Sequence, residues 1–206
     1  MKLIDISPLL SPRTAVWPGD VRFTREVCMD TDSGDHMTLS SINATVHLGA
    51  HADAPNHYRP QSTGIGERAL ERYYGNCQVV RVELPRGERI RPHHVKEAIT
   101  SSRVLFHTDS FPNPENWNSD FNALSAELVH ALAEQGVELV GIDTPSIDLQ
   151  EDKQLESHQA VAQHDMAILE GLVLTQVQPG EYTLCALPLK IEDADASPVR
   201  AILISE

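Results

Sequence analysis

The chain has few cysteines. Its 206 residues include only three, Cys28, Cys77 and Cys185, which are widely scattered and form no C-x-x-C pair. This spacing supports neither a disulfide framework nor a thiolate metal site. We therefore expect three reduced thiols.

Basic residues are also scarce. Sixteen Lys and Arg stand against thirty Asp and Glu, which gives a formal net charge of −14 at pH 7. This charge repels a phosphate backbone, and no basic patch in the sequence interrupts it. The composition excludes nucleic acid as an expected partner.

Long apolar runs are missing as well. No run approaches the roughly 20 residues that a helix needs to cross a bilayer. The N-terminus reaches Asp5 and Pro8 too soon for a signal peptide. We therefore expect a cytoplasmic protein with no membrane partner. The length and the 41% hydrophobic content predict a single domain over residues 1–206.

Histidine, by contrast, is concentrated in one segment. Residues 47–57 read His-Leu-Gly-Ala-His-Ala-Asp-Ala-Pro-Asn-His, which places His47, His51, Asp53 and His57 within eleven positions. Imidazole and carboxylate are ligands of Zn²⁺ and similar divalent ions. A polar loop with backbone-bonded histidines is the alternative, but four such groups packed this densely favour a metal site.

The glycine and the proline within this segment argue against a helix. Residues 37–46, just before it, are rich in β-branched side chains and predict a strand. We therefore expect the histidines at the end of a strand and on the loop that leaves it.

The rest of the chain reads as mixed α/β. Ser125 is a suitable N-cap for a helix over residues 126–135, which Gly136 would end. Further helices are predicted from Pro92 to residue 99 and over residues 67–74. Stretches rich in Val, Ile and Leu predict strands over residues 77–84, 103–108, 137–142, 167–174, 182–191 and 199–204.

The pattern His-x-Gly-x-His-x-Asp-x-Pro-x-His resembles the signature of the metal-dependent cyclase-like hydrolases, and among them the bacterial kynurenine formamidases. Ala50 stands where that family usually has Thr, whose hydroxyl could tune the metal ligands through a hydrogen bond. The similarity extends along nearly the whole chain. It includes the segments 17–20, 141–148, 169–171, 186–190 and 195–200, with His158 between them.

This resemblance implies a swivelling β/β/α fold, in which helices flank a curved, barrel-like mixed sheet. It also implies at least a homodimer and two zinc ions per subunit, although ligands of this type also accept Mn²⁺ or another divalent ion. The implied reaction is hydrolysis of N-formyl-L-kynurenine to L-kynurenine and formate. A cyclic amide such as isatin is an alternative substrate, and a non-catalytic metal-binding module is an alternative of another class.

A catalytic ion needs three or more protein ligands, which His47, His51 and Asp53 could supply. A carboxylate can also bridge two ions, so a second ion would need ligands from elsewhere. Glu170 ends an apolar run, where a carboxylate is costly to bury unless paired or metal-bound, although it could instead lie at the surface. The residues alone do not choose between His158 and His164 as its companion. The resemblance assigns His158 and Glu170.

His57 lies four residues beyond Asp53, past Pro55, and is therefore free to face a substrate. Imidazole has a suitable pKa for a general acid, and the resemblance gives this histidine the same catalytic role. Its alternative role is a further metal ligand. Trp17 precedes a Pro-Gly turn and must pack against something. The resemblance places it in the substrate pocket, and a core or interface position is the alternative.

The remaining histidines have no clustered partner in the sequence, and we assign them to structure or surface. Asp143 and Asp148 flank a Thr-Pro-Ser segment and are expected to shape a turn rather than carry chemistry. A position of this loop near the active site is the alternative. The histidines in this group are His36, His93, His94, His107 and His130.

Overall fold

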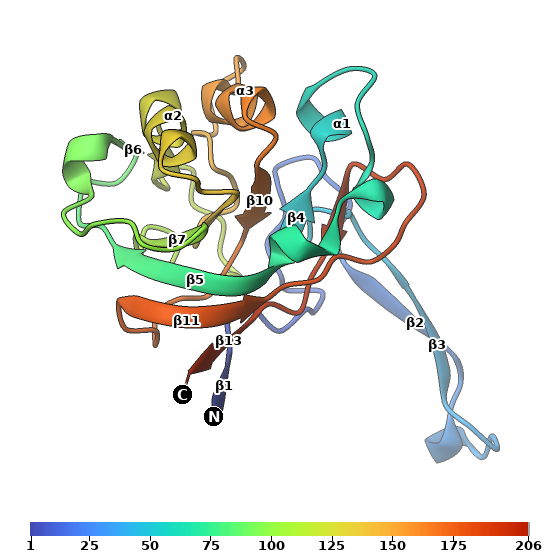
Figure 1. The fold of residues 1–206 in the computed structure, drawn as a ribbon. Helices are drawn as coiled ribbons and strands as arrows, with labels where there is room; N and C mark the ends of the chain where they lie inside the picture. The colour runs from blue at the N-terminus through green and yellow to red at the C-terminus, as the bar shows by residue number, and fades with distance from the viewer. Residues whose placement is uncertain (206) are drawn as a thin grey trace.

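The computed structural model describes residues 1–205, and a strongly curved sheet of nine strands organises the chain (Figure 1). The strand order across the sheet is β1-β13-β11-β5-β7-β9-β10-β4-β12. The strands are β1 (Lys2–Asp5), β4 (His51–Asp53), β5 (Tyr74–Arg81), β7 (Arg103–His107), β9 (Leu139–Ile142), β10 (Ala167–Glu170), β11 (Gly180–Cys185), β12 (Ala196–Pro198) and β13 (Ile202–Ser205).

The four central strands, β5, β7, β9 and β10, run parallel, whereas the outer pairings are antiparallel. Every residue of β7, β9 and β10 is buried. This agrees with their nearly continuous apolar sequences, because a parallel strand is covered on both faces. The predicted mixed, curved sheet is confirmed.

The two faces of the sheet pack into two cores. Leu105 and Leu169 point into the curl of the sheet, while Phe106 and Ile168 point toward the helices. Helices α2 (Ala126–Glu134) and α3 (Glu156–Gln163) cover that second face side by side (Figure 1). Successive side chains of a strand point to opposite faces of the sheet, so neighbouring residues pack into different cores.

Helix α2 begins where the sequence predicts. The Ser125 hydroxyl accepts a hydrogen bond from the Leu128 N–H, and Gly136 follows the helix with φ +84°. The other two predicted helices are wrong in type. Residues 67–74 contain the last residue of the 3₁₀ turn η2 (Ile65–Glu67) and the whole of η3 (Leu70–Tyr73). Pro92 begins only η4 (Pro92–His94). Such short segments lack the length that stabilises an α-helix.

Several strand boundaries also differ from the prediction. Strand β10 ends at Glu170 rather than residue 174, because Gly171 turns the chain with φ +65°. Strand β11 ends at Cys185 rather than residue 191, and β13 begins at Ile202 rather than residue 199. The apolar content of these segments does not specify where their strands begin or end.

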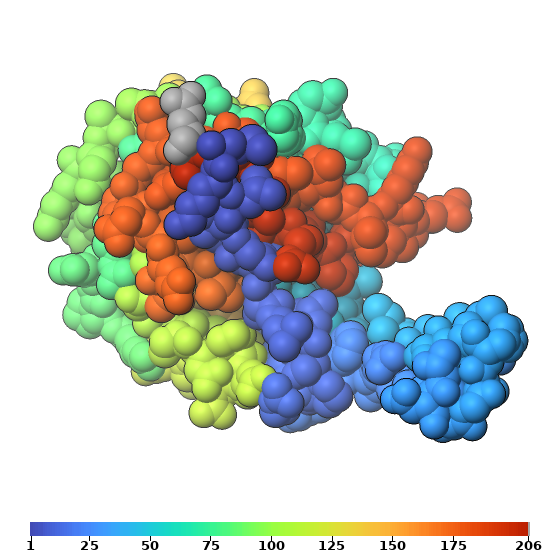
Figure 2. Space-filling model, turned by 90° about the horizontal axis from the view of Figure 1, so that it is seen from below, coloured from blue at the N-terminus to red at the C-terminus, as the bar shows by residue number. Residues whose placement is uncertain are grey.

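A hairpin projects from the body of the molecule (Figures 1 and 2). It consists of β2 (Thr24–Met29) and β3 (Leu39–Asn43), joined through the 3₁₀ turn η1 (Thr31–Ser33). Its strands are almost entirely exposed. A small separate sheet pairs β6 (Arg89–Ile90) with β8 (Ala123–Leu124). Among residues 1–205, no helix is both long and apolar enough to cross a membrane.

Candidate metal centre

Strand pairing brings the two halves of the histidine-rich site together. In the antiparallel pairing of β4 with β10, His51 lies opposite Glu170 and Asp53 lies opposite Ile168. His51 and Asp53 are two residues apart on a strand, so their side chains share one face of the sheet. The site is therefore built on strand β4, not on the end of the strand predicted over residues 37–46.

The other motif histidines flank this strand. His47 lies in the loop before β4, and His57 lies in the short helix α1 (Pro55–Tyr58) after it. Pro55 occupies the first turn of that helix, where its missing N–H is not needed. The expectation that Pro55 excludes a helix is therefore wrong for the end of the segment.

The buried carboxylate of Asp53 is the centre of the cluster. Its Oδ1 lies 3.0 Å from His47 Nδ1 and 3.4 Å from His51 Nε2. Its Oδ2 lies 3.3 Å from His158 Nε2, which comes from helix α3. The two oxygens of one carboxylate thus face imidazoles from two distant parts of the chain.

Glu170 closes the cluster on the other side. Its Oε2 lies 3.3 Å from His51 Nε2, its Oε1 lies 3.4 Å from His158 Nε2, and the Ile147 N–H donates to Oε1. His164 does not join this cluster. It follows α3 on the surface and shares a hydrogen bond with His130, with 2.8 Å between their nitrogens.

The Nδ1 hydrogen bonds of two imidazoles leave their Nε2 atoms facing the cluster. The only role of a carbonyl or carboxylate oxygen is to accept, so His51 Nδ1 donates to Gly49 O and His158 Nδ1 donates to Asp148 Oδ2. Their Nε2 atoms are then the ones available to a metal, and both lie beside carboxylate oxygens. A metal ion bound there would replace the proton of His158 Nε2 and would supply the missing partner of His51 Nε2.

Two buried atoms of the cluster lack a hydrogen bond. Within the described part of the chain, neither His51 Nε2 nor Asp53 Oδ1 has a hydrogen-bond partner. An orphaned buried polar atom destabilises a fold unless something satisfies it. Nitrogen and oxygen donors in this combination suit a divalent ion, so the residues fit a metal.

The electrostatics of the cluster also call for positive charge. Burial opposes charging of His158, but the carboxylates of Asp148, Asp53 and Glu170 outweigh it and hold the pKa of His158 well above its ordinary value. Burial likewise opposes ionisation of Asp53, yet the neighbouring imidazoles hold its pKa well below the ordinary value. A proton or a metal ion satisfies the same demand.

Sequence reasoning missed two carboxylates at this site. Asp148 does more than shape a turn, and its position agrees with the alternative that this loop lies near the active site. Its Oδ2 accepts from His158 Nδ1 at 2.8 Å, and Arg89 pairs with its Oδ1 at 2.7 Å. Asp195 Oδ2 lies 2.9 Å from His47 Nε2 and 3.7 Å from His57 Nδ1. Asp195 opens the segment 195–200, which was the one available signal.

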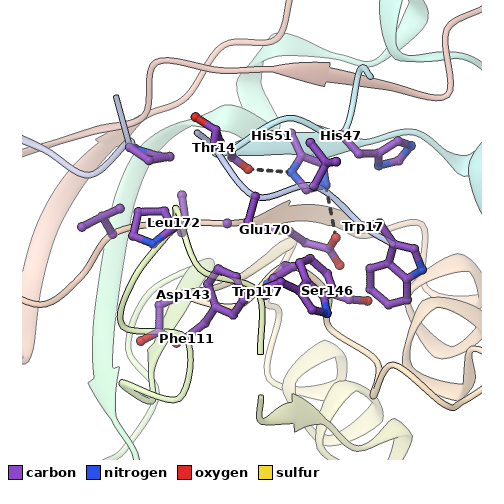
Figure 3. Close-up of a pocket in the computed structure, with 18 of the residues that line it drawn as sticks. Thr14, Trp17, His47, His51, Phe111, Trp117, Asp143, Ser146, Glu170 and Leu172 are labelled. Atoms are coloured by element: carbon purple, nitrogen blue, oxygen red, sulfur yellow. Dashed lines mark hydrogen bonds and ion pairs between the residues drawn. The ribbon is translucent and has the colours of Figure 1, made fainter. Parts of the chain in front are cut away.

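The cluster opens into a cavity of about 450 Å³ (Figure 3). His47, His51, His57, His158 and Glu170 line one part of it. Aromatic side chains line another part. They are Trp17, Phe111 and Trp117. Trp17 meets Trp117 edge to face with 5.3 Å between ring centroids, and Phe111 meets Trp117 at 5.7 Å. Trp17 thus lies on the cavity wall.

His57 lines the cavity and is about a third exposed, with a side-chain accessibility of 34%. Its ring centroid lies 4.3 Å from that of His47 and 6.0 Å from that of His158. One of its nitrogens is also within 4.8 Å of ligand atoms of Asp53 and His158. This position suits a proton donor facing the cavity and also permits direct ligation.

Gly171 fixes the distance between β10 and the histidine loop. A Cβ at this position would lie 2.1 Å from the carbonyl oxygen of Gly49, and φ is +65°. Gly171→Ala is therefore expected to destabilise the protein and to weaken metal binding. Left-handed backbone strain costs about 1–2 kcal/mol, and the clash adds about 1–3 kcal/mol more.

Gly87→Ala is the matched control for this substitution. Gly87 has φ +76°, but a Cβ there would meet nothing within 4 Å. Urea unfolding and zinc titration of both variants measure the difference. Equal losses of stability with unchanged zinc affinity would show that the close approach at Gly171 does not hold the site.

Comparisons with known proteins agree with this architecture. Residues 4–149 match the Cyclase family, described as "Putative cyclase". The chain therefore belongs to this family.

Several solved structures share the fold. One, a potential metal-dependent hydrolase with cyclase activity, has a TM-score of 0.83 and 24% identity, covering 98% of this chain and 96% of its own. A predicted metal-dependent hydrolase from Bacillus stearothermophilus has a TM-score of 0.82 and 24% identity, and the match covers 98% of this chain and 97% of that one. Isatin hydrolase A from Labrenzia aggregata has a TM-score of 0.79 and 19% identity, and the match covers 100% of this chain and 94% of that one.

Proposed function

We propose that this protein is a metal-dependent amide hydrolase that converts N-formyl-L-kynurenine to L-kynurenine and formate. The observation that carries the proposal is the composition of one cavity. Buried imidazole and carboxylate groups with unsatisfied atoms form one part of its wall, and aromatic rings form another. Membership of the Cyclase family and a fold shared with metal-dependent hydrolases support it.

We propose two zinc ions that share Asp53. His47 and His51 would hold one ion, and His158 and Glu170 would hold the other. Manganese or another divalent ion is compatible with the same ligands. When bound, such ions polarise the amide carbonyl and activate water near neutral pH.

The surrounding residues orient these ligands and handle the proton. The Gly49 carbonyl and Asp148 fix the tautomers of His51 and His158. His57 faces the cavity, where it can take the proton released by the attacking water. It then gives this proton to the nitrogen of the departing amine.

The aromatic wall suits an aryl substrate. Trp17, Trp117 and Phe111 line the cavity and meet one another edge to face, which is a contact that aromatic rings prefer. We assign this wall to the aminophenyl ring of the substrate. A storage site for metal has no need of such a wall or of a histidine that faces an open cavity.

Hydrolysis of a cyclic aryl amide is the second candidate. Isatin hydrolase A from Labrenzia aggregata has the same fold over the whole chain. The two candidates share the metal ligands and differ in the shape of the substrate. We favour the open-chain formamide because the sequence segments of the chain resemble those of the formamidases.

A turnover assay with both substrates tests the proposal. We expect the purified protein to hydrolyse N-formyl-L-kynurenine faster than isatin, and we expect a chelator to abolish both activities. Preference for isatin would favour the second candidate. Activity toward neither substrate, with metal bound, would contradict the proposed function.

We also propose that the protein is a homodimer held through the β2–β3 hairpin. An isolated two-stranded hairpin is marginally stable in water. This one exposes Val27 at 42% and Ile42 at 70%, and the register places both on one face. Burial of these side chains against a second copy would stabilise the hairpin.

Light scattering after gel filtration measures the oligomeric state. The wild type is expected to be dimeric, and the double variant Val27→Ser with Ile42→Ser is expected to be monomeric. Leu70→Ser is the control, because Leu70 is 52% exposed but lies away from the hairpin. A monomeric wild type, or a double variant that stays dimeric, would contradict this interface.

A further inference from the structure

A carboxylate lines the cavity at a distance from the metal centre. Asp109 follows β7, whereas Glu170 ends β10, and β9 lies between these two strands. Neighbouring strands are about 4.8 Å apart, so the two strand ends are separated by roughly 10 Å. Figure 3 shows the neighbouring Asp143 beside Phe111 and away from His47. The cavity therefore has an acidic position away from the metal centre.

The backbone holds Asp109 in a fixed and unusual conformation. Its φ is +55°, in the left-handed region that a non-glycine residue rarely adopts. Its N–H donates to Asp143 Oδ2 at 2.8 Å, and the Thr108 N–H donates to the same oxygen at 2.9 Å. The Thr108 hydroxyl donates to Asp143 Oδ1. Asp143 thus shapes this turn, and the turn fixes the position of the Asp109 Cα atom.

Two side chains hold the Asp109 carboxylate itself. Arg81 Nη2 lies 2.8 Å from Oδ2, and His107 Nε2 lies 2.9 Å from Oδ1. His107 has no clustered partner in the sequence, and its partner here comes from the β5–β7 register, which pairs Arg81 with His107 directly. Partial burial raises the pKa of Asp109, but His107 and Arg81 outweigh it and lower the pKa below its ordinary value. The carboxylate is therefore ionised at neutral pH.

This cluster does not suit a metal, although His107, Asp109 and Asp143 have ligand atoms within 4.8 Å of one another. The Arg81 guanidinium already occupies the space beside Asp109 and His107, where a metal ion would have to bind between their ligand atoms. Both oxygens of Asp143 accept hydrogen bonds from Thr108 and Asp109. Arg81, His107 and Asp143 therefore hold Asp109 in place through hydrogen bonds and ion pairs, without a metal ion.

The Asp109 carboxylate keeps acceptor capacity for a ligand. Each oxygen has one close partner from Arg81 or His107, whereas a carboxylate offers about four acceptor sites in all. Its side chain is 37% exposed and lines the cavity. An ammonium group, with three donors and a positive charge, is the complementary ligand.

We propose that Asp109 binds a primary ammonium group of the substrate and so selects aryl amides that carry a charged amine over uncharged ones. This inference rests on the proposed function, because it assigns a binding residue to the part of the substrate that lies farthest from the amide. In N-formyl-L-kynurenine the group is the α-ammonium of the amino-acid side chain. Arg81 and His107 act as positioning residues that hold the carboxylate toward the cavity.

The substitution Asp109→Asn tests this role. It removes the charge and keeps the size of the side chain. We expect kcat/KM for N-formyl-L-kynurenine to fall about 10- to 100-fold, the range of a charge-assisted hydrogen bond. For 2-formamidoacetophenone, which lacks the amino-acid group, kcat/KM is expected to stay within about twofold. Asp120→Asn is the control, since Asp120 pairs with Arg86 and does not line the cavity.

Equal losses on both substrates would overturn the proposal, because they would show a structural role for Asp109. A wild type that hydrolyses both substrates equally well would overturn it too. The preserved activity on the uncharged substrate also shows that the variant is folded.

A binding experiment separates this proposal from the proposed function. Calorimetric titration with L-kynurenine and with 2-aminoacetophenone requires no turnover. We expect the wild type to bind L-kynurenine at least tenfold more tightly, and we expect Asp109→Asn to lose that preference. If formamides are not hydrolysed but this preference is found, the proposed function fails and the ammonium site stands. Equal binding of the two probes by the wild type would overturn the ammonium site.

Discussion

Asp53→Ala is expected to release at least one metal ion per subunit and to abolish turnover. Both oxygens of Asp53 take part in the cluster, Oδ1 at 3.0 Å from His47 Nδ1 and Oδ2 at 3.3 Å from His158 Nε2. Its removal leaves these imidazoles without the negative charge that draws a cation between them. Elemental analysis of the purified variant, alongside its rate with N-formyl-L-kynurenine, measures both effects.

The control for this experiment is His164→Ala. His164 lies on the surface beside His130, and we expect the variant to keep its metal and nearly all of its activity. His158→Ala is expected to behave like Asp53→Ala. If the His164 variant lost metal while the His158 variant kept it, the assignment of the second ion would be wrong.

His57→Ala is expected to keep its metal and to lose most of its activity. The side chain faces the cavity beside the cluster, so its removal takes away the proton carrier and leaves the proposed ligands in place. General acid–base groups contribute roughly 10²- to 10⁴-fold to rate, and the loss should fall mainly in kcat. Metal content and kcat of the same preparation give the result.

The leaving group provides an internal control for His57. An amide whose departing amine is a weak base needs less help from a proton donor, so the loss in His57→Ala should shrink for that substrate. A fall in metal occupancy that matches the fall in activity would instead make His57 a ligand. The acid–base role would then belong to another residue.

The candidate ligands could be proposed from the sequence because four of the groups come from one short segment. His47, His51, Asp53 and His57 need no long-range information to be recognised as neighbours. Glu170 is different, because only the register of β4 against β10 brings it opposite His51. The family resemblance, not the residue pattern, selected it and His158.

The supporting carboxylates were not predictable in the same way. Asp148 lies in a segment with strong turn signals, and nothing local shows that its side chain is buried against His158. Asp109 and His107 meet Arg81 only because β5 and β7 are parallel neighbours. Pairings between strands far apart in the sequence depend on the whole fold, which hydrophobic periodicity does not specify.

The same distinction applies to the fold. Helix α2 has a clear beginning and end in Ser125 and Gly136, which act through local hydrogen bonds and backbone freedom. The predicted helix at Pro92 had a suitable first residue but no stop signal, and it became a single 3₁₀ turn. The curved, barrel-like form of the sheet followed from the resemblance, and the order of its nine strands was not predicted.

The most direct test of the central claim is a zinc titration of protein from which metal has been removed by chelation. Turnover of N-formyl-L-kynurenine is measured at each ratio of zinc to subunit. We predict negligible activity without metal and a rise in activity that reaches its maximum at two zinc ions per subunit. Full activity of the metal-free protein, or zinc binding that restores none, would contradict a metal-dependent hydrolase at this site.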